Sequence, residues 1–416
     1  MGGGDYLSMR RRSLARLAKM LVPNATPQEA VAIADRVMKM KWPTNTVLDS
    51  FGRPYPYRTS QFSEAELTTT INNLPPSNPS HLAAVAYIQL GPWPPWTHYL
   101  VRAAAANRAN VAFYFIGAQL PMALAAHCAS CYWLPFDAEL MQRRIEARLD
   151  MPHGSVRISG TKKICDLKPM WLDLFPELTQ RHQWFGFADS DILLGNISAE
   201  VEALRPADEL LVPMPFFPHP IANGNFMLMR SVPKMLQAYK RNPQWRAMLQ
   251  DKAYTWFDEW GSHKKYGSMA AVYQDMLLSS ELRVRPTLKM FVQDSIFRRD
   301  HRVVDMAQST SLLSLDWRRG ALTFERKGAC VCGDGVAAAH GPAACHECVK
   351  KPGEMLRNVT VHRKLEIMGF HVQTWKKSWK SAELIIAAAN SSLNRPAPPC
   401  DAEVFALTKR GFRCSL

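Results

Sequence analysis

The 416-residue chain lacks any uninterrupted apolar run of the ~18 residues that a membrane-spanning helix requires. Its first residues, MGGGDYLSMRRRSLARLAKMLVPN, also lack the apolar core of a secretory signal. We therefore expect no transmembrane helix and no clear signal peptide. The basic stretch from Arg10 to Lys19 would suit peripheral contact with a membrane surface or organelle targeting, with a solvated leader helix as the alternative. The compartment stays open between a Golgi or secretory lumen and the cytoplasmic face of a membrane.

Cysteine is too scarce for a disulfide-stabilised scaffold, with nine in the whole chain. Four of them gather in residues 329–351, an insert of small residues, as one CxC and one CxxC pair: Cys330, Cys332, Cys345 and Cys348. This spacing is typical of a structural zinc site, Zn²⁺ being held by four thiolates. In an oxidising compartment the same residues would form two disulfides, and free thiols are the third alternative.

Acidic residues are fewer than basic ones, 36 against 51, which gives a formal net charge of +15. Such a surplus favours an anionic partner, whether nucleotide phosphates, an acidic glycan, nucleic acid or a membrane surface. One hypothesis is therefore a nucleic-acid-binding protein that uses the cysteine insert as a zinc module and FHVQTWKKSWK as a basic, aromatic contact surface.

Strand and helix patterns alternate between residues 81 and 325. HLAAVAYIQLG and NVAFYFIG are apolar runs of strand length, and THYLVRAAAANRA between them favours a helix. This order predicts a βαβ unit, a parallel sheet and the α/β fold class. Further strands are expected at SVRISG, WFGFADSD, ELLVPMP, GNFMLMRS and VTVHRKLEI. Further helices are expected at KKICDLKPMWLDLFPEL, with a break at Pro169, and at 231–241, 243–250 and 268–281.

Changes in composition divide the chain into three parts. Residues 1–80 form an accessory leader with a helix from Pro27 to Met40 and a linker that ends in NNLPPSNPS. Residues 81–372 form the α/β domain, which contains the cysteine insert. Residues 373–416 form a C-terminal extension.

Two carboxylates follow a buried strand directly: Asp189 and Asp191 stand one residue apart after WFGFA. Ligands of open α/β sheets bind at the carboxyl ends of strands, and period-two alternation would point both side chains the same way. Paired carboxylates suit Mg²⁺ or Mn²⁺, which can bridge a diphosphate. The alternative is an ordinary turn.

The order of these motifs resembles the GT-A class of nucleotide-sugar glycosyltransferases with a DxD motif. The resemblance rests on five segments: AVAYIQLG, KICDLKPMWLDLFPEL, WFGFADSDILLGNI, IANGNFMLMRS and NVTVHRK. The pattern is most similar to uncharacterised bacterial and algal glycosyltransferase-like proteins. It implies a Rossmann-like GT-A fold over residues 82–370. It also implies Mn²⁺- or Mg²⁺-dependent transfer of a sugar from a nucleotide-diphosphate donor, by class frequency a UDP-sugar, to a glycan or other hydroxyl acceptor.

The resemblance also implies roles for individual residues. Asp191 and Asp189 would bind the metal, with Asp189 also near the ribose, and His362 would complete the metal site. The remaining donor contacts would come from Asp166, Lys168, Asn223, Gly224, Asn225 and Lys364. From chemistry alone, Lys168 could instead cap a helix, His362 could be a structural histidine and Gly224 could permit a tight turn.

An inverting transfer also needs a base, and Asp258 and Glu259 are the candidates. They lie among Trp256, Phe257 and Trp260, where desolvation would raise a carboxylate pKa toward a useful value. Asp275 is the second choice, and an aromatic core cluster with an acidic edge is the alternative. A retaining transfer needs no such base. The resemblance makes nucleic acid the less favoured partner, and an inactive glycosyltransferase-like binding protein is the remaining hypothesis.

Overall fold

The described residues of the computed structural model belong to two compact units. They are 26–39, 62–158 except 77, 92, 95–96, 119, 121–123 and 125, then 163–214, 222, 224–259 and 265–293, and the strand residues 47–48, 54–55, 312–318, 321–328, 361–367, 369–371, 404–408 and 411–414. One unit is Met1–Tyr57 with Gln373–Pro399, and the other is Arg58–Val372 with Cys400–Leu416.

The first unit contains helix α2 (Pro27–Lys39), where a helix was predicted, and the antiparallel pair β1 (Val47–Leu48) and β2 (Pro54–Tyr55). The second unit begins earlier than the predicted division at residue 80. Helix α3 (Glu64–Asn72) belongs to it because Leu67 and Ile71 are buried in its core. A capping box fixes the start of α3: Glu66 N donates to Ser63 Oγ and Ser63 N donates to Glu66 Oε2.

A nine-stranded mixed sheet forms the centre of the second unit. In spatial order its strands are β5 (Cys131–Pro135), β4 (Val111–Gly117), β3 (Ala83–Gln89), β6 (Trp184–Ala188), β9 (Phe226–Arg230), β8 (Leu210–Met214), β10 (Val284–Gln293), β14 (Gly369–His371) and β7 (Ile192–Leu194). Strands β3, β4, β5 and β6 are mutually parallel, whereas β9 runs antiparallel to β6. The α/β fold class predicted from the sequence is confirmed.

The order of the parallel strands defines where a ligand would bind. The chain proceeds from β3 outward to β4 and β5, then returns and places β6 on the other side of β3. This is the strand order of a Rossmann-like sheet, and the reversal between β3 and β6 is its topological switch point. The carboxyl ends of these two strands, at Gln89 and Ala188, therefore border the expected binding crevice.

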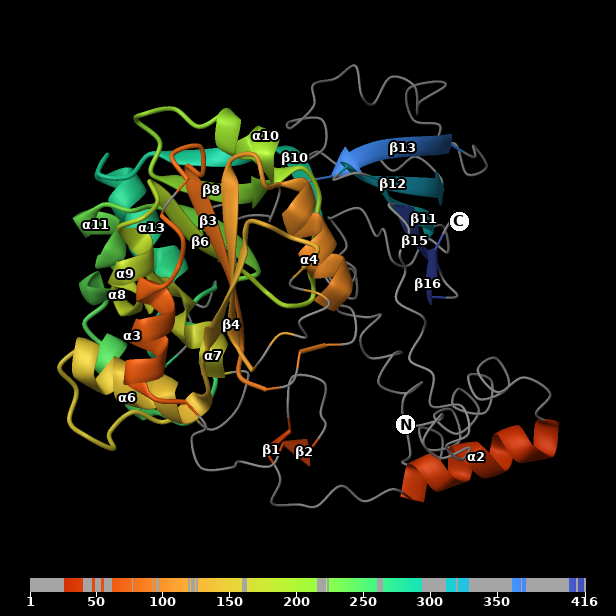
Figure 1. Ribbon diagram of the computed structural model, residues 1–416, viewed down its shortest axis with the longest axis horizontal. Coiled ribbons are helices and arrows are strands. Elements are labelled where there is room, and N and C mark those ends of the chain that lie inside the picture. The colour runs from red at the N-terminus through yellow and green to blue at the C-terminus, as the bar shows by residue number, and fades with distance from the viewer. Residues whose placement is uncertain are drawn as a thin grey trace, which may run out of the picture. The chain divides into compact units, whose positions relative to one another are not determined.

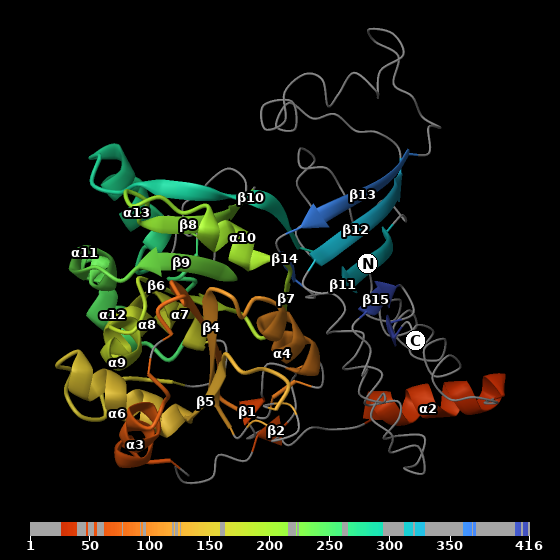
Figure 2. The same cartoon turned by 45° about the horizontal axis from the view of Figure 1, so that its top comes forward.

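Helices cover both faces of the sheet, which explains why every residue of β3 and β4 is buried. Helix α4 (Thr97–Ala106) lies on one face, and α6 (Ala138–Arg148), α8 (Trp171–Leu174) and α9 (Pro176–Thr179) lie on the other (Figures 1 and 2). The remaining helices of this unit are α10 (Ile197–Glu202), α11 (Pro233–Leu236), η2 (Ala238–Arg241), α12 (Trp245–Gln250) and α13 (Met269–Leu278). No helix among the described residues is both long and apolar enough to cross a bilayer.

The predicted helix before β6 is a series of short turns. It consists of α7 (Lys163–Leu167), the 3-10 turn η1 (Lys168–Met170), α8 and α9. Pro169 coincides with the predicted break, because proline cannot continue the α-helical hydrogen bonding. The expected strand at SVRISG is wrong for its described part: residues 155–158 form no strand.

A separate five-stranded antiparallel sheet is built from the later part of the chain. Its order is β13 (Val361–Ile367), β12 (Ala321–Gly328), β11 (Leu312–Arg318), β15 (Val404–Thr408) and β16 (Gly411–Cys414). The predicted strand at VTVHRKLEI is confirmed as β13. Strands β15 and β16 lie in the stretch predicted to be a C-terminal extension, yet they pair with β11.

Candidate functional site

The DSD turn (Asp189–Ser190–Asp191) follows β6 directly and lies at the switch point. Asp189 N donates to the carbonyl oxygen of Asn225, and Ile192 N donates to that of Asp189 at 3.0 Å, which closes the turn. Ser190 Oγ donates to Gln89 Oε1 at 3.0 Å, so the last residue of β3 holds the middle of the turn. The two predicted carboxylates therefore stand at the carboxyl ends of β3 and β6, the topological switch point.

Lys168 is the buried cation beside this turn. Its Nζ lies 2.6 Å from Asp189 Oδ1 and 3.3 Å from Asp258 Oδ2, and it donates to the carbonyl oxygen of Gly224. Burial alone would lower the pKa of Lys168, but Asp189, Cys165 and Asp258 together raise it well above its usual value. The structure thus brings together three residues that were predicted from separate motifs. Lys168 thus contacts Asp189, Asp258 and Gly224, and these contacts favour a role in the site over the alternative of capping its own helix.

Asp258 and Glu259 lie in the loop between α12 and α13, and they differ in burial. Asp258 is only 1% exposed, whereas Glu259 is partly exposed. Lys168 Nζ is near enough to Asp258 for an ion pair but not in hydrogen-bond geometry, and neither Asp258 oxygen accepts a hydrogen bond from the described residues. Burial raises the pKa of Asp258 well above its usual range; Lys168 opposes this, while Glu259, Asp166 and Asp189 add to it. Glu259 is thus the more accessible of the two.

Gly224 has a steric reason to be glycine. A Cβ atom there would lie 2.4 Å from Glu259 Cγ and 2.5 Å from Asp258 Oδ2. The missing side chain lets the two acidic residues approach the backbone before β9, beside Asn225, which is 7% exposed. Close approach, rather than turn geometry alone, therefore accounts for this glycine.

Asp166 was expected near the donor sugar, and the structure places it in the interior. It is fully buried, and its oxygens accept hydrogen bonds from Thr255 N and Phe257 N, each at 2.9 Å, and from Lys163 Nζ at 3.0 Å. These bonds hold the loop that carries Asp258 and Glu259. They support a positioning role.

Cys165 was missed from the sequence. The residue is partly exposed as a whole, but burial of its thiol raises the pKa of that group well above the usual value, although Lys168 opposes the shift. One feature of the sequence could have indicated Cys165: it stands three residues before Lys168, which is one turn of a helix. Another cysteine pair, the CxxC of Cys128 and Cys131, forms a disulfide at the start of β5.

The carboxylates of the DSD turn fit a divalent cation in their chemistry. The Asp189 side chain is about a quarter exposed, 24%, and Asp191 is 6% exposed. Mg²⁺ sites commonly use one or two carboxylates and complete their shell with water and substrate phosphates. Among the residues whose side chains the structure describes, a set that does not include His371, no three His, Cys, Asp or Glu side chains gather closely enough to hold a metal by themselves.

Two histidines stand on strands from the later chain. His362, predicted to complete the metal site, lies on β13, where it is paired in register with Lys327 of the five-stranded sheet. His371 lies on β14, where it is paired in register with Ile192, the residue after Asp191. The topology therefore brings His371 next to the DSD turn. The sequence offered only the strand-like GFH as a signal.

Other predicted site residues are described in part or not at all. Lys364 lies on β13 opposite Glu325, and nothing beyond this register is described for it. Outside the described residues lie Asn223, Trp260 and the four cysteines of the insert, Cys330, Cys332, Cys345 and Cys348. The structural zinc predicted there stays a prediction.

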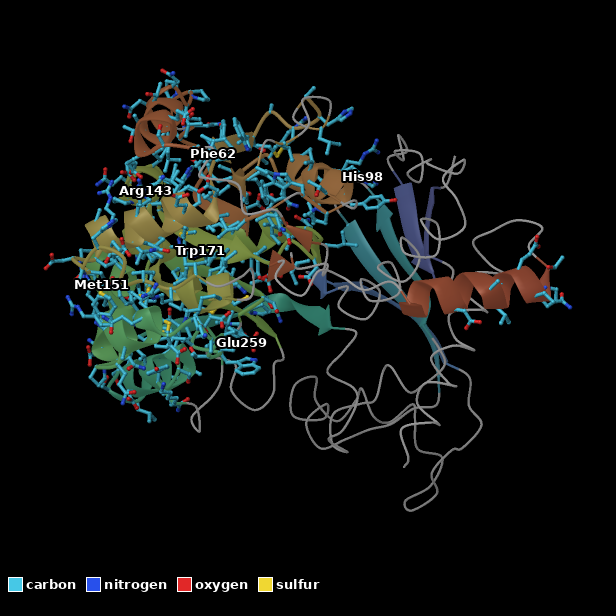
Figure 3. The ribbon with its side chains drawn as sticks, turned by 90° about the horizontal axis from the view of Figure 1, so that it is seen from below. Phe62, His98, Arg143, Met151, Trp171 and Glu259 are labelled. Carbon is cyan, nitrogen blue, oxygen red and sulfur yellow. A yellow bond between two sulfur atoms is a disulfide. The ribbon has the colours of Figure 1, made fainter. Side chains whose placement is uncertain are left out.

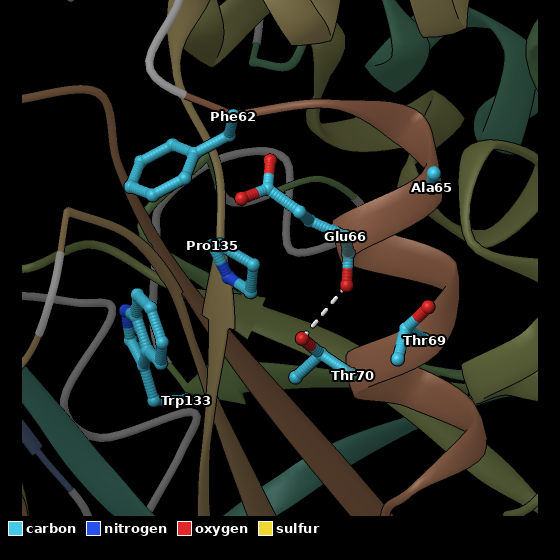
Figure 4. A pocket seen from close by; sticks show the side chains of 7 residues that line it. All are labelled: Phe62, Ala65, Glu66, Thr69, Thr70, Trp133 and Pro135. Carbon is cyan, nitrogen blue, oxygen red and sulfur yellow. Dashed lines mark hydrogen bonds between the residues drawn. The ribbon is translucent and has the colours of Figure 1, made fainter.

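A hollow lies between α3 and β5 (Figure 4) and has a volume of about 400 Å³. Its lining residues are Phe62, Ala65, Glu66, Thr69, Thr70, Trp133 and Pro135. Its one carboxylate, Glu66, is engaged in the capping box of α3. Figure 3 shows Phe62 well apart from Glu259, so this hollow is distinct from the site at the DSD turn. We assign it no chemistry.

Comparison with known proteins gives one family and several distant structures. A family model described as a family of unknown function, DUF6625, matches residues 85–325. No curated protein matches the chain. Mouse xyloside xylosyltransferase 1 is similar over 55% of this chain and 92% of its own, with 12% identity and a TM-score of 0.32. The galactosyltransferase LgtC matches over 54% of this chain and 81% of its own, with 11% identity and a TM-score of 0.30.

The glycosyltransferase GlyE of Streptococcus pneumoniae matches over 49% of this chain and 44% of its own, with 9% identity and a TM-score of 0.29. These TM-scores are too low to support an argument about function. The function is therefore inferred from the residues of the chain itself.

Proposed function

The chain belongs to DUF6625, a family of unknown function, and we propose that it is a metal-dependent glycosyltransferase. It would move a sugar from a nucleotide-diphosphate donor, a UDP-sugar by preference, to a hydroxyl group of a glycan or other acceptor. The observation that carries this proposal is the DSD turn at the switch point between β3 and β6, with Lys168 buried against Asp189.

The donor diphosphate is assigned to this turn on electrostatic grounds. Asp189 and Asp191 would hold a Mn²⁺ or Mg²⁺ ion, and His371, next to the turn in strand register, is the favoured third ligand. Such a cation, when bound, would neutralise charge on the diphosphate leaving group. Lys168 fixes Asp189 through their 2.6 Å ion pair, so one metal-facing carboxylate is oriented in advance.

Glu259 is the favoured base for an inverting transfer. The acceptor oxygen would form a bond to the anomeric carbon as the bond from that carbon to the diphosphate oxygen breaks, and the diphosphate would leave with the electron pair. The acceptor proton would pass to the Glu259 carboxylate, which is partly exposed. Asp258 is buried beside Lys168, and its protonation state would influence the electrostatic potential at the reacting groups.

The test of this assignment is Mn²⁺-dependent binding of UDP, measured by isothermal titration calorimetry on the full chain. We expect binding with Mn²⁺ that EDTA abolishes, and a loss of about tenfold or more in the Asp191→Ala variant. The matched control is Asp275→Ala, which removes an exposed carboxylate on α13. Equal UDP affinity in EDTA, or an effect of the control as large as that of Asp191→Ala, would overturn the assignment.

A further inference from the structure

Trp256 has an unusual backbone conformation for its residue type. Its φ is +57°, in the left-handed region that non-glycine residues rarely adopt. Two other described non-glycine residues have positive φ, Asp150 and Ser280. Each of these follows the C-cap of a helix, α6 or α13, where a left-handed residue is common. Trp256 follows no helix end, so helix termination does not account for its conformation.

The buried carboxylate of Asp166 accounts for the left-handed conformation of Trp256. The carboxylate accepts hydrogen bonds from the amides of Thr255 and Phe257, the two residues that flank Trp256. Lys163 neutralises the buried carboxylate, and its Nζ also donates to the carbonyl oxygen of Ala253 at 3.0 Å. Because both neighbouring amides are fixed by one buried group, the backbone between them is held in the left-handed region. We call Asp166 and Lys163 the clamp.

The clamp leaves the indole of Trp256 facing outward. Trp256 is 42% exposed, although Thr255, Phe257 and Asp258 beside it are all buried. Its ring packs partly on Tyr254, with centroids 4.6 Å apart. Glu259 N donates to the carbonyl oxygen of Trp256, so the indole and the favoured base belong to one turn. Backbone strain that is maintained by a dedicated buried carboxylate is typical of functional sites.

We propose that the Trp256 indole is a stacking platform for a pyranose ring of the acceptor, and that Asp166 is the positioning residue that presents it. The inference rests on the proposed function, because that function places the acceptor hydroxyl at Glu259. Sugar rings bind through their C–H faces to flat aromatic surfaces, and a rigid indole supplies a large one. A ring held on the turn of Glu259 would bring a hydroxyl group toward that carboxylate.

The test uses the full chain with UDP and Mn²⁺ on an array of immobilised, defined oligosaccharides, with Mn²⁺-dependent binding of UDP measured in parallel. Trp256→Gly removes the indole and also relieves the left-handed strain, so a loss of binding would not reflect a damaged fold. Ser280→Gly is the matched control, since it relieves the same kind of strain without changing an aromatic residue. Trp256→Phe keeps a smaller aromatic face.

We expect wild type and Ser280→Gly to bind the same oligosaccharides equally. Trp256→Gly should weaken this binding about tenfold or more, and Trp256→Phe less. Mn²⁺-dependent binding of UDP by Trp256→Gly should stay within about twofold of wild type, because the indole does not belong to the diphosphate site. Undiminished glycan binding by Trp256→Gly, or no glycan binding by wild type, would overturn the inference.

The role of Asp166 is tested by a double-mutant cycle. Asp166→Asn should weaken glycan binding in the wild-type background and leave it unchanged in the Trp256→Gly background, because both residues act through one indole. Additive effects would overturn the positioning role. The two proposals also fail separately. Glycan binding that depends on Trp256, without any Mn²⁺-dependent binding of UDP, would keep the platform and overturn the proposed donor site. Mn²⁺-dependent binding of UDP, together with glycan binding that does not depend on Trp256, would keep the donor site and overturn the platform.

Discussion

At the scale of single residues, the site depends on one buried lysine shared by two carboxylates. Lys168 is 2.6 Å from Asp189 and 3.3 Å from Asp258, and it remains charged because these groups outweigh the effect of its burial. Removing one partner of such a set leaves a buried charge uncompensated, which costs more than a surface ion pair contributes. Burial makes ionisation of Asp258 unfavourable and raises the pKa of this carboxyl well above its usual range.

The raised pKa of Asp258 predicts a fall in stability with rising pH. Above about pH 4 the unfolded chain has released this proton, whereas the folded chain still binds it, so the free energy of unfolding decreases as pH rises toward the folded pKa. Asp258→Asn cannot titrate and should show a flatter profile. Urea denaturation at a series of pH values in EDTA measures this. Parallel profiles for wild type and variant would contradict the account.

The residues of the site were predictable one by one, but not their contacts. Asp189, Lys168 and Asp258 each stood out by local context, as a strand end, a helix break and an aromatic cluster. The bonds of Asp166 to Thr255 and Phe257 join positions 89 and 91 apart in the chain. A carboxylate that binds backbone amides so far away leaves no local pattern, and the sequence therefore suggested a donor contact instead.

At the scale of elements, a buried arginine joins three helices far from the site. The Arg144 side chain on α6 is 1% exposed, pairs with Glu64 of α3 and Glu177 of α9, and donates to the carbonyl oxygen of Leu174 at 2.7 Å. Its guanidinium also lies over the Phe175 ring, 5.1 Å from the centroid. This network fixes α3, which was predicted to belong to the leader, onto the α/β core.

Arg144→Leu should therefore destabilise the second unit by about 1–3 kcal/mol, because the charge-assisted hydrogen bonds that join α3, α6 and α9 are lost. Its neighbour Arg143 is the control: it is 40% exposed and forms an ion pair with Glu139 one turn away. Arg143→Leu should cost less than about 1 kcal/mol. Chemical denaturation measures both. Similar losses for the two variants would show that burial of Arg144 does not matter.

Element types were predicted well where apolar patterns were continuous. Strands β3 and β4 lie within the runs HLAAVAYIQLG and NVAFYFIG, since a strand buried on both faces must be apolar throughout. The predicted strand at SVRISG failed because its alternation was too short to distinguish a strand from a loop. The predicted long helix after it became four short turns, which Pro169 and Pro176 both favour.

At the scale of the whole molecule, strand pairing assembles the candidate metal site from distant parts of the chain. Strand β14 lies between β10 and β7, parallel to the first and antiparallel to the second. This brings His371 in register with Ile192, directly after the DSD turn. Such an arrangement follows from topology and not from local pattern, so the sequence alone did not indicate His371.

His371→Ala should weaken Mn²⁺-dependent UDP binding about tenfold or more, since loss of even an outer-shell partner of a metal has that effect. His362→Ala is the matched control and should leave the affinity within about twofold of wild type. Calorimetric titration of both variants with UDP, in Mn²⁺ and in EDTA, measures the difference. A larger effect at His362 would restore the assignment made from the sequence.

We propose above that the DSD turn binds a metal–diphosphate for sugar transfer. Its most direct test is nucleotide release from a panel of UDP-, GDP- and CMP-sugars, with Mn²⁺ or with EDTA, for wild type and Asp191→Ala. We expect nucleotide release from one class of donor. This release should require Mn²⁺ and should be lost in Asp191→Ala. Release that persists in EDTA and in Asp191→Ala would contradict it.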